Sequence, residues 1–483
     1  MSNQVIFNWE KLLSAKRRSK DEEKDMPDIW ACARTEIERD YDRIVFSAPT
    51  RRLANKTQVF PMEEHDSIRT RLTHSNEVSN LARGAGVSLC CNGFFNNKNI
   101  DRDRLIRDIP ALLSTIGIVH DMGNPPFGHQ GEKAIQDWFK EELKESKYID
   151  HFQDFLNFDG NAQTLRLVTS LHSADGHFGM DLTTATLAAM VKYPVFNSDK
   201  KGFAKGGVFN SEKYIFEEVW YKTGLREGIR HPLCYILEVC DDIAYATIDA
   251  EDTIKKGYAS YSDLKNWLDE ELGKNEFFNQ TYTKIAEEVK KFKHRHGKDI
   301  TSEVQKEVSV EIFRSITINK LLSSATNCFL EDFYSEKHKL WFSRGEGVPY
   351  EISKNFEFNK EIKALKNFTR NYGFNNSSVL MLELQGRNRI HELMNYVWLG
   401  IKNTDENLNI DNHYEKYILS KISINYLREF KRKYKDASKP EEKLYAKYQL
   451  LTDYISGMTE SYLDRTHSEI KPLYESFSKC NKP

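Results

Sequence analysis

Hydrophobic and polar residues along this chain recur mainly with the three- and four-residue spacing of an amphipathic α-helix. Segments with the two-residue alternation of a β-strand are few. The helical segments that matter most are 68–83, 109–121, 182–194, 233–252 and 380–394. The best candidate for strands is the stretch from Gly207 to Ile215. The pattern therefore predicts an all-α protein with at most a small β-hairpin.

The helix predicted over 109–121 ends in a histidine beside an aspartate. Its apolar residues lead directly to His120 and Asp121. Gly123 and the segment 124–126 follow, and they force a loop because proline cannot continue a helix. A neutral imidazole next to a carboxylate is a common pair of metal ligands. We interpret this helix end as a candidate site.

A second histidine opens the next helical pattern. His129 and Glu132 are three residues apart, so they share one face of a helix. This arrangement suits an acid/base imidazole that a carboxylate orients. The other His-Asp pair, His65–Asp66, follows a charged stretch without an apolar run, and we interpret it as a solvated loop or helix cap.

Two further helices carry candidate residues. In segment 68–83, Arg71 lies about one turn before His74, although a single histidine in such a position is more often a core or surface residue than a ligand. In segment 233–252, an apolar first half makes an aspartate costly unless it is paired or binds a cation. Asp241, Tyr245 and Asp249 are spaced to share one face there, and surface salt bridges are the alternative.

The composition describes a globular protein without an obvious macromolecular partner. Of 483 residues, 39% are hydrophobic and 29% charged, and the net charge of −2 gives no general basicity for nucleic acid. The seven cysteines are scattered without a CxxC pair, which favours reduced thiols. The N-terminus is polar, and no apolar run approaches membrane-spanning length. We expect a cytoplasmic protein without membrane association.

The candidates combine into one mixed set of ligands. His74, His120, Asp121 and Asp241 supply two imidazoles and two carboxylates from three helices. Nitrogen and oxygen ligands of this kind suit a divalent metal such as Mn, Mg, Fe, Co, Ni or Zn. A divalent metal ion is therefore the expected cofactor.

The order His, then His-Asp, then Asp is the pattern of the HD-domain phosphohydrolases. The long string from His120 to Glu132 is more specific, and with it the chain resembles the deoxynucleoside triphosphate triphosphohydrolases of the dGTPase-like branch. The segments that carry the resemblance are Lys56–Phe60, Arg69–Ser75, His120–Glu132, Gly160–Gln163, Leu182–Thr183, Lys192–Pro194, Ser211–Lys213 and Asp241–Tyr245, with Leu382–Gly386 as weaker support.

The resemblance implies a reaction and a role for each matching residue. The reaction is dNTP and water to deoxynucleoside and tripolyphosphate, with dGTP among the substrates. The four mixed ligands would hold the metal. His129, oriented by Glu132, would help the 5′ oxygen to leave. The implied substrate contacts are Arg71 and Lys192 for the phosphates, Asn161, Tyr193 and Tyr245 for the nucleotide pocket, and Gln58 and Asp249 for the deoxyribose.

The resemblance also implies an organisation and partners. We expect an N-terminal lead-in over 1–50, an HD-domain catalytic core over 51–255, and a C-terminal helical region over 256–483 that continues the core. A homo-oligomer, hexamer or tetramer, is implied. A nucleotide effector between subunits and single-stranded DNA, which some relatives bind, are the other implied partners.

Some positions depart from the family pattern. Asp159 stands where family members often carry Glu, the loop 172–179 is long, and Arg387 and Arg389 follow Gly386 where an aromatic or neutral residue is expected. These arginines leave the base preference and any effector site open. A loop with Lys200, Lys201 and Lys205 has two interpretations, a phosphate grip and a mobile loop.

Two other functions stay open beside the triphosphohydrolase. One is an HD phosphohydrolase acting on another nucleotide, such as a monophosphate, a cyclic nucleotide or an alarmone. The other is a nucleotide-sensing or single-stranded-DNA-binding HD protein without activity. The intact metal set and the intact His129–Glu132 pair argue against the second, because a degenerate site is expected to lose at least one of these residues.

Overall fold

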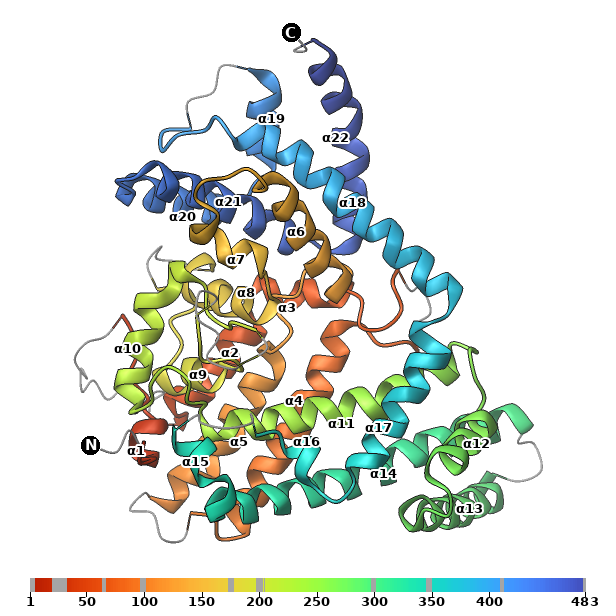
Figure 1. Cartoon of the computed structure of the whole chain (residues 1–483). Helices are drawn as coiled ribbons and strands as arrows, with labels where there is room; N and C mark the ends of the chain where they lie inside the picture. Colours follow the sequence, from red (N-terminus) through yellow and green to blue (C-terminus); the bar gives the residue numbers. More distant parts are fainter. Residues whose placement is uncertain are drawn as a thin grey trace.

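Helices form the regular structure of this protein, as the computed structural model in Figure 1 shows. The structure describes residues 5–19, 33–62, 67–95, 101–172, 178–196, 203, 205–296, 301–344, 350–408 and 412–480. His65–Asp66, Lys200 and Lys201 lie outside the described residues. Within the described ranges the only β pairing is three isolated bridges, so the all-α prediction is confirmed.

The helices of the first half are α1 (Trp9–Leu12), α2 (Glu36–Val45), α3 (Ala48–Arg52), α4 (Arg71–Cys91), α5 (Arg102–Val119), α6 (Gly128–Glu142), α7 (Gln153–Leu156), α8 (Gly160–Arg166), α9 (Thr184–Ala189), α10 (Lys213–Thr223) and α11 (Pro232–Lys255). Short 3₁₀ turns are η2 (Leu53–Asn55), η3 (Ile149–Phe152) and η5 (Asn210–Glu212), and a π-helical turn is η4 (Leu167–Leu171).

The helices of the second half are α12 (Tyr261–Leu272), α13 (Glu276–His296), α14 (Ser302–Tyr334), α15 (Glu336–Arg344), α16 (Ile352–Asn355), α17 (Asn359–Phe368), α18 (Ser377–Ile401), α19 (His413–Lys421), α20 (Ile424–Asp436), α21 (Pro440–Ser456) and α22 (Glu460–Cys480). A π-helical segment, η7 (Thr369–Phe374), joins α17 to α18.

Two helices of the core, α4 and α5, approach each other closely because small residues face each other. A Cβ added at Gly117 would lie 2.6 Å from the Cα of Ser79, so only glycine permits this distance. The Ser79 hydroxyl also donates to the Ser114 carbonyl oxygen at 2.8 Å. The close approach brings His74, near the start of α4, towards His120, which follows the end of α5.

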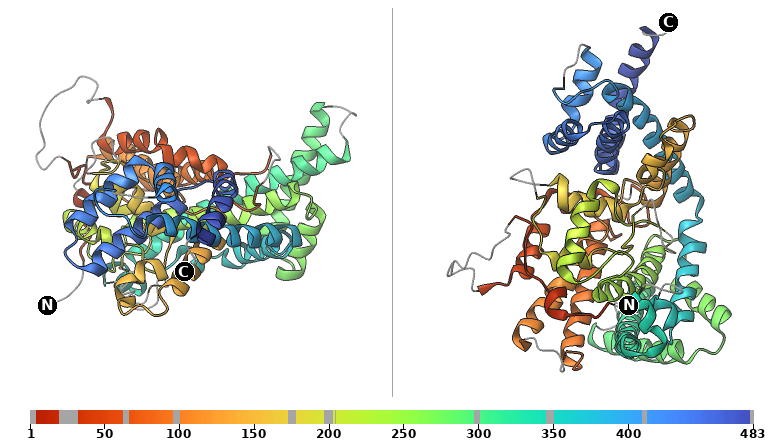
Figure 2. Two further views of the ribbon diagram at one scale, coloured as in Figure 1. Left: turned by 90° about the horizontal axis from the view of Figure 1, so that it is seen from above. Right: turned by 60° about the vertical axis from the view of Figure 1, so that its left-hand side comes forward.

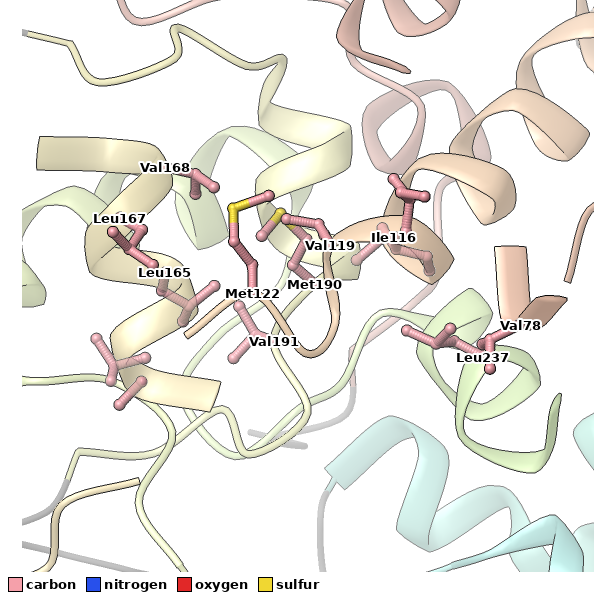
Figure 3. Close-up of a cluster of buried hydrophobic side chains, with 14 of the residues drawn as sticks. Val78, Ile116, Val119, Met122, Leu165, Leu167, Val168, Met190, Val191 and Leu237 are labelled. Carbon is pink, nitrogen blue, oxygen red and sulfur yellow. The ribbon is translucent and has the colours of Figure 1, made fainter. Parts of the chain in front are cut away.

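A cluster of buried hydrophobic side chains, shown in Figure 3, includes residues next to these helix ends. Val78, Ile116, Val119 and Leu237 are buried, and each lies within about one helical turn of a predicted metal ligand. Burying such side chains contributes roughly 1.5–3 kcal/mol each. The cluster therefore fixes the backbones of α4, α5 and α11 on which the candidate ligands stand.

The prediction of a β-hairpin from Gly207 to Ile215 is wrong. Val208 forms one isolated parallel bridge with Phe196, and the chain then enters η5 and α10. The apolar residues of α10 repeat with helical spacing, and Ile215, Phe216 and Val219 are buried on one face. Burial of that face favours the helix.

The predicted helix over 182–194 is shorter than expected. α9 ends at Ala189, and Lys192 and Tyr193 lie in the irregular segment that follows. Proline disfavours helical backbone angles at the residue before it, which here is Tyr193. The other four segments singled out by the pattern lie in or overlap α4, α5, α11 and α18.

The C-terminal helices pack back on the first half of the chain. α18 packs on α6 and also against α21 and α22. Figures 1 and 2 show α19–α22 gathered at one end of the molecule, and Figure 1 shows α12–α14 at the opposite end. No helix among the described residues has the length and apolar character needed to cross a membrane.

Candidate metal centre and active-site cavity

The four predicted metal ligands meet where α4, α5 and α11 come together. The Nε2 atom of His74 lies 3.2 Å from Oδ1 of Asp241, and Nε2 of His120 lies 3.5 Å from the same oxygen. His120 Nε2 is also 3.6 Å from Oδ1 of Asp121. The donor atoms of His74, His120 and Asp121 all lie within 4.8 Å of one another.

Hydrogen bonds orient these side chains. Nδ1 of His120 donates to the carbonyl oxygen of Gly117 at 2.7 Å, so in the neutral imidazole the lone pair of Nε2 faces the cluster. That buried Nε2 has no hydrogen-bond partner among the described residues. Asn124 donates to one oxygen of Asp121 at 2.6 Å, and Arg71 donates to the other at 2.5 Å. An orphaned imidazole nitrogen among carboxylates fits a divalent cation.

The electrostatics of the cluster favour a positive charge at its centre. Burial opposes ionisation, but Arg71 and His120 lower the pKa of Asp121 to about 2. Burial likewise opposes the ionisation of Asp241, yet the charge and hydrogen bonds of His120 and His74 hold its pKa well below the usual range. Burial would lower the pKa of His120, but Asp121 and Asp241 raise it to about 9. A bound cation would likewise stabilise the ionised carboxylates of Asp121 and Asp241.

His129 and Glu132 form the pair that their spacing predicts. The Nδ1 atom of His129 lies 3.1 Å from Oε2 of Glu132, and the other carboxylate oxygen accepts the backbone N–H of Gly160 at 2.8 Å. The hydrogen bond to Glu132 raises the pKa of His129. Burial would raise the pKa of Glu132, but His129 and Lys205 hold it below its usual value. The carboxylate is therefore ionised and fixes the imidazole.

A single cavity of about 960 Å³ contains most of these residues. The predicted site residues on its wall are Gln58, Arg71, His120, Asp121, His129, Glu132, Asn161, Lys192, Tyr193, Asp241 and Tyr245. His74 lies behind the wall, where it contacts Asp241. The volume is in the range of sites for nucleotide-sized ligands.

Asp249 is the predicted site residue that the structure does not bring to the cavity. Its side chain is fully buried two turns after Asp241, and it is not among the cavity-lining residues. Neither carboxylate oxygen has a hydrogen-bond partner among the described residues. Burial, reinforced by the charges of Asp252 and Asp241, raises its pKa well above the ordinary value. Burial therefore favours the neutral form of this carboxyl group.

Several cationic groups line the same cavity. Lys192 lies 3.5 Å from Glu238, which also pairs with Arg230 at 2.7 Å. Lys205 pairs with Asp159 at 2.5 Å and lies 3.6 Å from Glu132. Lys205 belongs to the loop for which the sequence left a phosphate grip and a mobile loop open, and its side chain is held at the cavity wall.

Sequence reasoning missed the wall that the C-terminal half contributes. Its members are Lys366, Asn367, Arg370, Phe374, Asn375, Leu380 and Glu383, from α17, η7 and α18. The ring of Tyr245 stacks on Phe374, with centroids 5.9 Å apart and planes 15° apart. Lys366 lies 5.4 Å from the centre of the same tyrosine ring and pairs with Asp242 at 2.5 Å. In the sequence, the only sign of this wall is the helical spacing of its basic and aromatic residues.

The unusual arginines after Gly386 face other helices. Arg387 pairs with Asp137 of α6 at 2.6 Å, and Arg389 pairs with Asp464 of α22 at 2.6 Å. Neither arginine lines the cavity. Their side chains join α18 to its neighbours.

The fold and the cluster define an all-α protein with a candidate divalent-metal centre in the wall of a large polar cavity. No family model matches the chain. Its relatives include a deoxyguanosinetriphosphate triphosphohydrolase-like protein of Listeria monocytogenes, 33% identical over 97% of this chain and 100% of the relative, and one of Synechocystis, 30% identical over the same shares. A deoxyguanosinetriphosphate triphosphohydrolase of Yersinia pestis is 28% identical over 88% of this chain and 92% of the relative. The chain therefore belongs to the deoxyguanosinetriphosphate triphosphohydrolase-like family, which confirms the resemblance.

Proposed function

We propose that this protein hydrolyses deoxynucleoside triphosphates, dGTP among them, to deoxynucleoside and tripolyphosphate with the help of a divalent metal ion. The observation that carries the proposal is the meeting, in one cavity, of a His/Asp cluster, an oriented His129–Glu132 pair and several cationic side chains. The names of the full-length relatives support the substrate class.

The metal would be held by His74, His120, Asp121 and Asp241. Their mixed nitrogen and oxygen donors accept Mn, Mg, Fe, Co, Ni or Zn. When bound, such an ion polarises a phosphate oxygen and makes a water molecule more acidic. The contribution of the chain is to hold the donors in place, as Gly117 does for the imidazole of His120.

The phosphates would lie against Arg71 and Lys192. Binding a triphosphate requires neutralisation of its charge as it loses hydration. Arg71 is held by Asp121, and Lys192 lies near Glu238, so both cations are already oriented at the cavity wall. The restraint lowers the entropy that these long side chains lose when substrate binds.

Hydrolysis at the α-phosphorus breaks its bond to the 5′ oxygen. That oxygen would leave as a poor alkoxide unless it receives a proton, and His129 would supply one. The Nδ1 atom of His129 is engaged by Glu132, so Nε2 is the atom free to donate. Since its side chain is 89% exposed to the cavity and solvent, the imidazole is accessible to substrate.

The nucleoside would occupy the part of the cavity lined by Gln58, Asn161, Tyr193 and Tyr245. A close fit around the 2′ carbon would exclude ribonucleotides. The proposal does not include a direct substrate contact by Asp249, because this side chain lies outside the cavity wall.

The test is product analysis. Purified protein with Mn or Mg is incubated separately with each of the four dNTPs and with GTP, and the products are resolved by ion-exchange chromatography. We expect deoxynucleoside and intact tripolyphosphate from at least one dNTP, and no product from GTP. If no single dNTP gives product, mixtures of dNTPs are tested, because the family resemblance implies a nucleotide effector that would act as an activator.

Other products would contradict the proposal. Monophosphate with pyrophosphate, or stepwise release of phosphate, would indicate attack at another phosphorus and a different phosphohydrolase. Absence of product from every dNTP and mixture would favour a nucleotide-sensing protein without turnover.

A further inference from the structure

The first residue of α22, Glu460, is a buried carboxylate that joins two loops of the cavity. Its Oε1 atom accepts the backbone N–H of Thr57 at 2.9 Å and that of Phe127 at 3.1 Å. Its other oxygen accepts the hydroxyl of Thr57. Glu460 is 5% exposed, so water has little access to replace these bonds. One side chain therefore satisfies two backbone donors that are distant in sequence.

Both donors lie beside residues of the proposed active site. Thr57 precedes Gln58, and Phe127 is followed by Gly128 and His129. All five residues line the cavity. Because the amide of Phe127 is only two residues from His129, a shift of this backbone moves the imidazole directly. The carboxylate thus holds both the sugar side and the leaving-group side of the cavity.

Phe127 has a backbone conformation that needs external support. Its φ of 61° lies in the left-handed region, which is costly for a bulky side chain. Its ring packs on Gly386 of α18, where an added Cβ would lie 2.5 Å from the ring. Two elements of the C-terminal region, α18 and α22, therefore hold the residue from which α6 begins.

A buried lysine makes a parallel link. Lys56 donates to the carbonyl oxygen of Asn124 at 2.5 Å and to that of Ser456, at the end of α21, at 2.9 Å. The carbonyl oxygen of Lys56 in turn accepts the N–H of Arg71 at 3.0 Å. The loop between α5 and α6 is thus tied to the C-terminal helices at two points, through Asn124 in its middle and through Phe127 at its end.

We propose that Glu460 is a positioning residue for His129, which it keeps in place by holding the backbone of Phe127. The inference rests on the proposed function and adds to it a task for the C-terminal region. Both amides bond to the same oxygen, Oε1, so the proposal assigns the positioning to this acceptor atom and expects a neutral group with an oxygen in that place to serve as well.

The experiment compares Glu460→Leu with Glu460→Gln. Leucine is similar in size but leaves two buried amides without an acceptor, whereas glutamine keeps a carbonyl oxygen. Displacement of a catalytic group by about 1 Å costs up to about 100-fold, so we expect kcat of the leucine variant to fall about 10- to 100-fold. Its KM should change much less than kcat, its metal content should be unchanged, and the glutamine variant should keep kcat near wild type.

Asp464→Asn is the matched control. It removes the ion pair between α22 and Arg389 of α18 without touching the loops of the cavity. We expect wild-type kcat from this variant. If Glu460→Leu does not fold, Glu460→Asp replaces it, because the shorter side chain withdraws the acceptor while it preserves the charge, and kcat should fall although the charge remains.

The outcomes separate this inference from the proposed function. Lack of turnover by the wild-type protein would remove the proposed function and this inference with it. With an active wild type, the inference alone fails if the leucine variant keeps its kcat, if glutamine is as damaging as leucine, or if Asp464→Asn lowers kcat equally.

Discussion

The two walls of the cavity are built from different kinds of contact. On the wall from the first half of the chain, His120, His129 and Asp121 are each held by a hydrogen bond to a neighbouring group. On the wall from the second half, Phe374 stacks on Tyr245, Lys366 pairs with Asp242, and most of the other members are polar side chains. The first wall fixes the directions of atoms, and the second provides surface and charge.

The difference suggests that the two walls have different functions. Proton transfer and metal binding need donor atoms placed to within a few tenths of an ångström, which favours residues at fixed short spacing on rigid helices. Recognition of a base or a phosphate tolerates more freedom. We therefore expect variants of the first wall to lower kcat, and variants of the second wall to change KM and substrate preference.

The largest effect is expected from Asp241→Ala. This carboxylate lies within 3.5 Å of both imidazoles of the cluster, so its removal would take away a proposed ligand and a negative charge that favours a cation. We expect loss of both bound metal and turnover, measured by elemental analysis and product formation. Asp242→Ala is the control, because Asp242 pairs with Lys366 on the second wall and should leave the metal content intact.

His129→Ala should abolish turnover while bound metal persists. The imidazole lies outside the metal cluster, and loss of general acid catalysis costs roughly 10²- to 10⁴-fold in rate. Elemental analysis and steady-state kinetics on the same preparation provide the comparison with Asp241→Ala. Near wild-type turnover would show that the acid/base assignment is wrong.

The pH dependence should respond to Glu132→Gln. The hydrogen bond to Glu132 raises the pKa of His129, and Lys205 and Arg71 oppose that shift. A general acid works only while protonated, so kcat falls as the pH rises through this pKa. Without the carboxylate the pKa falls, and the alkaline limb of the kcat profile should move to lower pH. An unmoved limb would mean that His129 does not titrate in the rate-limiting step.

The first wall could be predicted from the sequence because its residues occur in compact motifs. His120 and Asp121 are adjacent at the end of an apolar helix, and the three-residue spacing of His129 and Glu132 places that pair on one face of the next helix. That α4, α5 and α11 converge could not be deduced from the pattern, since it depends on close contacts such as Gly117 against Ser79.

The second wall could not be predicted for a physical reason. Lys366, Arg370 and Phe374 lie four residues apart across α17 and η7, which by pattern alone describes an ordinary solvated helix face. A π-helical segment also changes the angle between successive residues, so the helical period no longer tells which side chains share a face. The contact with Tyr245 exists only in the folded protein.

The smallest effect is expected from Phe374→Leu. This variant also tests most directly whether the two walls have different functions. Leucine keeps an apolar side chain but removes the stack on Tyr245, and such pairs contribute about 0.5–1.5 kcal/mol beyond burial. If the stacked ring orders the nucleotide pocket, KM should rise by about 2- to 10-fold with kcat nearly constant. Tyr372→Leu is the matched control, because its ring packs on Phe368 and Trp267 away from the cavity, and KM should stay unchanged. An equal fall of kcat in Phe374→Leu and His129→Ala would erase the distinction between the two walls.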